Sequence, residues 1–217
     1  KKPLPRPEVP PYWGPYASAA PANMADWRRF VTEVVVRYGD RIDSYETWNE
    51  ATSPYLWQGT AVEMAQMTKI LHDVVRQHDP SGMVLAANSQ TVEQSNWFKT
   101  FFPAYMRALK ARKWPVDAVT LHTYAGSPKT TAEQGMRRRA EALAYIVEAA
   151  RKAGVPKSVE LWDTETNYLG KDGSGKYQQA YLAVRRSGTE HEREDGHHAP
   201  IKEACQTFGG SETDNLA

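Results

Sequence analysis

Short apolar runs alternate with longer amphipathic stretches along most of the chain. Four runs rich in β-branched and aromatic residues have the length of buried strands: 42–48, 83–87, 118–122 and 159–163. Between them lie stretches whose apolar positions recur every three to four residues: 61–78, 95–112 and 131–153. Because a parallel strand can be reached only through a crossover, this alternation predicts a parallel α/β sheet.

A helix is also expected before the first strand. Asn23 is a favourable N-cap, apolar residues follow at a period near 3.6 from Trp27 to Tyr38, and Gly39 is placed to end the helix. Residues 1–21 hold seven of the 14 prolines, which predicts an extended arm or loop, since proline fixes φ and lacks an N–H.

The region after residue 186 has a different character. Residues 187–217 are polar and show no period of 2 or 3.6, which predicts a disordered tail. The alternating region, 22–186, is then the folded domain. Its strand–helix units repeat every 36–40 residues, which suits a (β/α)₈ TIM barrel at ~31 residues per unit plus long loops, and equally an open doubly wound sheet. A closed barrel needs eight strands, so a barrel built from this chain would be incomplete.

Composition and charge exclude several classes of partner. The chain has 217 residues and a net charge of +1, so no strong field would attract nucleic acid or an anionic membrane. No apolar run approaches the ~20 residues of a membrane span. Cys205 is the only cysteine, which excludes an internal disulfide. No signal peptide is visible, and the compartment stays open, secretion included.

Histidines of the polar tail are the obvious candidates for metal binding. His191, His197 and His198 could serve as ligands in principle, but a polar tract without periodicity is expected to be solvated. We therefore expect neither a metal nor an organic cofactor.

Every predicted strand ends in polar residues. Ligands of parallel α/β proteins bind at the C-terminal ends of the strands. Those ends carry Asn49-Glu50, residues 88–90, residues 122–124 and residues 163–167. The pattern predicts a polar site along one edge of the sheet.

Glu50 and Glu165 lie three strand–helix units apart. In an open sheet they would be separated by well over ~10 Å, at ~4.8 Å per strand, whereas a curved barrel brings them face to face. Two carboxyl groups ~5 Å apart are what a retaining glycosidase needs, one as nucleophile and one as acid/base. Asn49, beside the first acid, could bind a sugar hydroxyl.

The strand ends also resemble a known family. YETWNEA (45–51) resembles the fourth barrel strand of clan A glycoside hydrolases, which ends in Asn-Glu, and ELWDTETNY (160–168) is similar to their seventh strand. LHTYAG (121–126) resembles the sixth, and 27–50 together with WNEATSPYLWQG (48–59) looks like glycoside hydrolase family 39. The resemblance covers about residues 12–186.

The resemblance implies an incomplete TIM barrel holding about strands 4 to 7. It implies a retaining glycoside hydrolase that acts on a carbohydrate by double displacement, with Glu50 as general acid/base and Glu165 as nucleophile. The residues that it implicates in substrate binding are Asn49, Trp57, His122, Tyr124 and Trp162.

Two further acids are set aside. Strand alternation puts Asp163 and Glu165 on the same face, and the Trp-x-Thr-Glu match favours Glu165. Glu46 is expected at the start of its strand, far from the C-terminal edge, so no catalytic role is assigned to it.

Two other interpretations stay open. The chain could be a truncated, inactive barrel remnant that at most binds carbohydrate and self-associates through unpaired sheet edges. It could also be an unrelated doubly wound enzyme, although it has no Gly-x-Gly-x-x-Gly, P-loop or Gly-x-Ser-x-Gly motif.

Overall fold

The computed structural model describes residues 8–11, 13–14, 16–90, 96–124 and 132–166, and the backbone of 201–203. The expected tail is thus described only at its short segment 201–203, and its disorder stays a prediction. The tail histidines and Cys205 lie outside the described residues.

Four helices form where the periodicity predicts them, and their bounds agree within one or two residues. They are α1 (Met24–Tyr38), α2 (Ala61–His78), α3 (Asn96–Lys110) and α4 (Ala132–Ala153). Asn23 caps α1 by accepting a hydrogen bond from Ala25 N at 2.9 Å. Thr60 and Glu63 form a reciprocal capping box at the start of α2.

The described residues form one six-stranded sheet in which every pair is parallel, as predicted. The strands are β1 (Ser44–Glu46), β2 (Met83–Leu85), β3 (Ser89–Gln90), β4 (Ala118–His122), β5 (Glu160–Glu165) and β6 (Ile201–Glu203). Their order is β1-β2-β4-β5-β6, and β3 pairs with β4 beyond the end of β2. The spatial order therefore follows the chain, whereas a doubly wound sheet reverses direction at a switch point.

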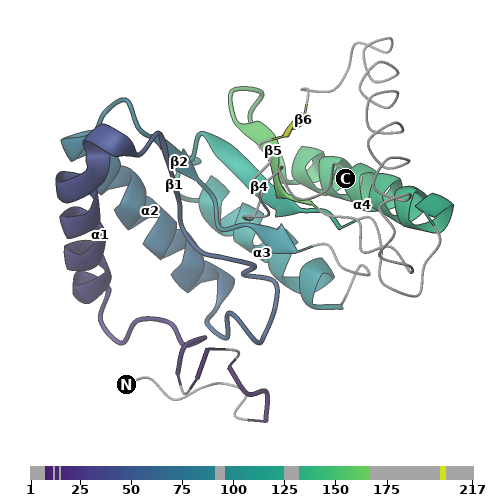
Figure 1. The fold of residues 1–217 in the computed structure, drawn as a ribbon, viewed down its shortest axis with the longest axis horizontal. Helices are drawn as coiled ribbons and strands as arrows, with labels where there is room; N and C mark the ends of the chain where they lie inside the picture. The colour runs from purple at the N-terminus through teal and green to yellow at the C-terminus, as the bar shows by residue number, and fades with distance from the viewer. Residues whose placement is uncertain are drawn as a thin grey trace, which may run out of the picture.

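The helices lie in a single layer that follows the same order as the strands (Figure 1). Successive helices contact each other: α1 packs on α2, α2 on α3, and α3 on α4. Strands and helices that both progress in chain order are typical of a strand–helix barrel. The two outer strands, β1 and β6, do not pair with each other, so the sheet is not closed within the described residues.

The core consists of two apolar clusters. The larger, between α2, α3, α4 and the sheet, is built around Phe98, Phe102, Leu109 and Ile146. The smaller, between α1, α2 and the first two strands, contains Val31, Val35, Tyr45, Leu71, Val75 and Val84. None of the helices described here is long and apolar enough to span a bilayer.

An ion pair connects α2 to the N-terminal ends of β2 and β4. Arg76, on α2, donates from Nη2 to both carboxylate oxygens of Asp117, at 2.6 and 2.7 Å. Asp117 in turn accepts from Val84 N at 2.6 Å. This ion pair lies at the N-terminal ends of the strands, opposite the end at which the sequence predicts a site.

Candidate active site

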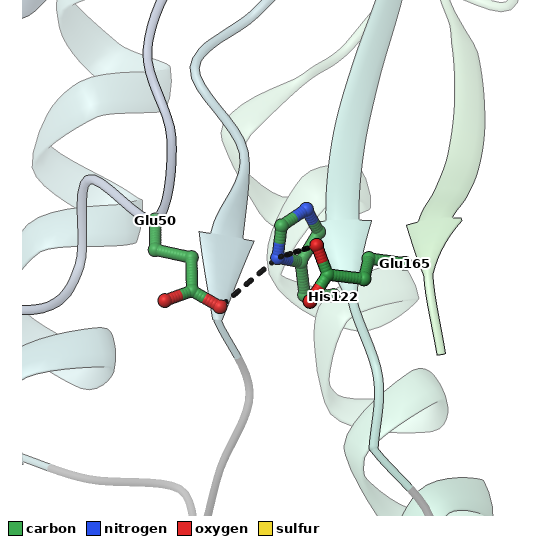
Figure 2. Close-up of side chains that lie close together, drawn as sticks. All are labelled: Glu50, His122 and Glu165. Atoms are coloured by element: carbon green, nitrogen blue, oxygen red, sulfur yellow. Dashed lines mark hydrogen bonds and ion pairs between the residues drawn. The ribbon is translucent and has the colours of Figure 1, made fainter. Parts of the chain in front are cut away.

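Three side chains converge at the C-terminal edge of the sheet. Glu50 lies in the turn after β1, while His122 and Glu165 are the last residues of β4 and β5 (Figure 2). His122 Nδ1 lies 3.0 Å from Glu50 Oε1 and 3.8 Å from Glu165 Oε2. One ligand atom of each of the three lies within 4.8 Å of the others. The two acids that the sequence places three units apart therefore do meet.

His122 is the buried member of this group. Its side chain is 3% exposed, against 13% for Glu50 and 25% for Glu165. A proton on Nδ1 would be donated to Glu50 Oε1. The histidine ring therefore lies between the two acids and is in contact with both.

A β-bulge in β5 turns Glu165 toward the site. Asp163 pairs with Leu121 and Glu165 pairs with His122, so Thr164 is an extra residue in the register. Simple alternation would put Asp163 and Glu165 on one face, and that prediction is wrong. Asp163 instead contacts Arg139 of α4, whereas Glu165 lies beside His122.

An open cleft of about 460 Å³ lies beside the acids. Of the predicted site residues, Asn49, Glu50, Tyr124 and Glu165 line it, and His122 lies against the two acids. Gln90, at one of the polar strand ends, also lines the cleft, together with four residues that the sequence did not point to: Trp13, Ser53, Tyr55 and Leu56. The aromatic pair Trp13 and Tyr55 is exposed, at 76% and 51%. A tryptophan in the proline-rich arm was the signal that could have identified this wall.

The structure does not bring the other two predicted tryptophans to the cleft. Trp57 is 3% exposed and packs edge-on against Trp48, with ring centroids 5.4 Å apart. Trp162 is half-buried on β5, and its indole N–H donates to Glu160 Oε2 at 2.6 Å. Trp57 is a packing residue of the loop after β1, so it presents no free face to a sugar.

Glu46 lies closer to the site than the sequence analysis expected. It is the last residue of β1, since that strand spans only three residues, and its carboxylate accepts from Asn88 Nδ2 at 2.7 Å. Loss of solvation raises its pKa, and hydrogen bonds from Thr120 and Asn88 act in the opposite direction.

The same three residues are the candidate metal ligands of the described part of the chain. Glu50, His122 and Glu165 offer two carboxylates and one imidazole, a set that suits several divalent ions. An ion bound there would take up carboxylate oxygens of Glu50 and Glu165, both of which line the cleft. Metal binding and chemistry by the free carboxylates therefore exclude each other.

Comparison with known proteins identifies a shared fold and no close relative. No family model matches the sequence, and neither does any curated protein. Among solved structures, the chain is similar to a glucosidase from Croceicoccus marinus, with a TM-score of 0.55 and 15% identity over 75% of this chain and 34% of that one. It is also similar to a GH39 β-xylosidase from Caulobacter crescentus, with a TM-score of 0.52 and 17% identity over 90% of this chain and 41% of that one.

These likenesses concern the fold alone. Both neighbours are glycoside hydrolases, and the chain spans between a third and two-fifths of their lengths, as the covered shares of 34% and 41% indicate. The parallel sheet with its single helix layer is therefore a glycosidase-like fold.

Proposed function

We propose that this chain is the catalytic portion of a retaining glycoside hydrolase with a (β/α)₈ barrel. The observation that carries the proposal is the approach of Glu50 and Glu165, whose ligand atoms lie within 4.8 Å of each other beside an open cleft. Retaining enzymes hold their two carboxyl groups ~5–5.5 Å apart, while inverting enzymes need ~6.5–9.5 Å to admit a water. The geometry favours retention.

In the proposed reaction Glu165 attacks the anomeric carbon while Glu50 donates a proton to the departing glycosidic oxygen. The bond between carbon and that oxygen breaks, and a glycosyl ester forms on Glu165. Glu50, now a carboxylate, removes a proton from water, which attacks the same carbon and releases Glu165. Each acid ends in the state in which it began.

The remaining polar residues support this pair. His122 contacts both carboxylates and holds their separation, and Asn49 and Tyr124 face the cleft where hydroxyl groups of the sugar would lie. Trp13 and Tyr55 offer exposed aromatic faces suited to stacking on a pyranose ring. We propose these two, rather than Trp57 and Trp162, as the stacking residues.

The strand order supports an incomplete barrel with about strands 4 to 7. Strands in chain order and one helix layer fit a barrel segment, and the chain spans 34% and 41% of the two glycosidases described above. The remaining strands would close the cleft on its open side. The substrate that follows is a carbohydrate with an O-glycosidic bond. We also propose that the chain is related to glycoside hydrolase family 39, which its sequence resembles.

The test is hydrolysis of a panel of aryl glycosides by the full-length protein. Glu50→Gln and Glu165→Gln should each lower turnover by at least ~100-fold, because acid–base catalysis alone contributes about 10²–10⁴. The exposed Glu141→Gln is the matched control and should leave turnover unchanged. NMR of the first-formed sugar should show the retained anomer; an inverted product, or full activity in both variants, would refute the assignment.

A second candidate is a carbohydrate-binding remnant without activity. The open sheet favours it, since an unclosed barrel holds only one wall of a site within the described residues. Calorimetric titration with xylo- and gluco-oligosaccharides discriminates between the two. Binding without hydrolysis by the full-length protein would establish the remnant.

A further inference from the structure

The backbone at Glu50 is strained. Its φ of +46° lies in the left-handed region, which a glutamate rarely adopts. Such a conformation is unfavourable and persists only where its surroundings hold it. The turn that presents the proposed acid/base therefore needs an identifiable restraint.

Asn88 supplies that restraint. It is fully buried just beyond β2, and its side-chain Oδ1 accepts from Glu50 N at 2.6 Å. Its backbone carbonyl accepts from Ala51 N at 3.0 Å, and its own N–H donates to Trp48 O at 3.1 Å. Asn88 is therefore hydrogen-bonded to the backbone before, at and after Glu50.

Glu46 fixes the direction in which the Asn88 amide points. Asn88 Nδ2 donates to Glu46 Oε2 at 2.7 Å and approaches Asn49 Oδ1 at 3.3 Å. Because an amide NH₂ group can only donate, it faces the Glu46 oxygen, and the amide oxygen then faces Glu50 N. The chain Glu46–Asn88–Glu50 is therefore directional.

We propose that Asn88, anchored by Glu46, is the positioning residue that holds Glu50 in its strained turn and so aims the acid at the glycosidic oxygen. The inference rests on the proposed function, because it assigns a role within the same site. Asn88 does not line the cleft, so it would act through the residues that it contacts, chiefly Glu50.

The leaving group of the substrate separates this role from a merely structural one. A poor leaving group, such as an alkyl alcohol or a second sugar, needs a proton from Glu50, whereas 2,4-dinitrophenolate departs without one. Asn88→Ala in the full-length protein should lower kcat/KM at least tenfold more for methyl or disaccharide substrates than for the dinitrophenyl glycoside. A misplacement of about 1 Å can cost ~10²-fold, which makes this difference measurable.

Two reference variants make the result decisive. Glu50→Gln should show the same leaving-group preference in stronger form. Leu109→Ala, which opens the core at a fully buried residue far along α3, should lower the rates for both substrates by one common factor. Glu46→Gln keeps an acceptor for Asn88. Its kcat/KM for the methyl or disaccharide substrates should therefore fall less than that of Glu46→Ala.

Amide hydrogen exchange gives a reading that does not depend on activity. In Asn88→Ala the protection of the Glu50 amide should fall at least tenfold relative to the wild type, while amides of α3 stay protected. Equal loss for both substrates in Asn88→Ala, with Glu50→Gln still selective, would overturn the positioning role. Should Glu50→Gln show no selectivity, the proposed function fails, and unchanged exchange at Glu50 would then also overturn the restraint by Asn88.

Discussion

A buried ion pair between Asp163 of β5 and Arg139 of α4 lies beside the proposed nucleophile. Asp163 has a side chain that is 0% exposed, and Arg139 Nη2 donates to it at 2.8 Å. Thr123 adds a short hydroxyl hydrogen bond to the same carboxylate. Burial raises the pKa of Asp163, and the hydrogen bonds from Thr123 and Arg139 oppose that rise. The ion pair holds the end of β5, and with it Glu165, against the helix layer.

Removing Arg139 should therefore be costly. Arg139→Leu leaves an uncompensated buried carboxylate, and we expect a loss of about 3–5 kcal/mol in the free energy of unfolding. Urea denaturation measures it, and the double variant Arg139→Leu/Asp163→Asn should recover part of the loss. Without its cation, Asp163 would hold its proton in the folded state more tightly than in the unfolded chain. The deficit should then shrink as the pH falls from 7 toward 4, and a deficit that grows instead would contradict this account.

The environment of Tyr45 leads us to expect that the folded state loses stability at alkaline pH. It is 7% exposed and its hydroxyl donates to Asp79 Oδ2 at 2.9 Å. Burial, followed by the contact with Asp79, raises the pKa of Tyr45 to about 12. The unfolded chain releases this proton first, near pH 10, so the folded state binds more protons between pH 10 and 12 and stability falls across that interval.

The matching measurement compares Tyr45→Phe with the wild type. The wild type should lose about 1–2 kcal/mol more than the variant between pH 10 and 12, since one pKa unit corresponds to ~1.4 kcal/mol. The exposed Tyr38→Phe is the control and should keep the wild-type slope. Parallel curves for the wild type and Tyr45→Phe would show that the folded state does not disfavour the phenolate.

Helices and strands differ in how far local pattern determines them. The bounds of α2 agree with the expected 61–78 because its apolar positions recur at a helical period from Ala61 to Val75. β3 could not be predicted, because two polar residues, Ser89 and Gln90, become a strand only by pairing with β4. The bulge at Thr164 is likewise set by the register against β4 and not by any local signal.

The site residues likewise differ in whether local sequence or tertiary contacts determine their roles. Glu50, Glu165 and His122 could be recognised because each ends an apolar strand run, and chain topology then brings strand ends together. Asn88 lies at a polar strand end, but its importance could not be predicted, since it rests on a hydrogen bond to a residue 38 positions away in the chain. The roles of Trp57 and Trp13 depend on how loops pack, which residue type and spacing do not encode.

The capping box of α2 makes a prediction about that helix. The Thr60 hydroxyl oxygen accepts a hydrogen bond from Glu63 N at 3.1 Å. The Glu63 carboxylate accepts one from Thr60 N at 2.8 Å. Thr60→Ala should cost ~1 kcal/mol of unfolding free energy, as N-cap substitutions typically do. Glu63→Gln, which can keep both halves of the box, should cost less than half as much in the same urea titration. An equal cost would assign the stabilisation to the charge of Glu63 instead.

α2 joins the two core clusters into one body. Its N-terminal half contributes Met64 and Met67 to the larger cluster, and its C-terminal half contributes Leu71 and Val75 to the smaller. A single rigid helix that is shared in this way couples the packing of α1 and β1 to that of α3 and α4. The part of the sheet around β1, which precedes Glu50, and the part around β5, which carries Glu165, should therefore unfold together.

That coupling can be tested with one cavity in each cluster. Leu71→Ala and Ile146→Ala remove buried side chains that are 4% and 0% exposed, and each should cost about 2–5 kcal/mol. Because the residues belong to different clusters, the double variant should equal the sum within ~0.5 kcal/mol. Tryptophan fluorescence and circular dichroism should report one coincident urea transition in every variant. If Leu71→Ala separated an early transition from a late one, the α1–β1 side would be an independent unit. The spacing of Glu50 and Glu165 would then depend on a hinge in α2.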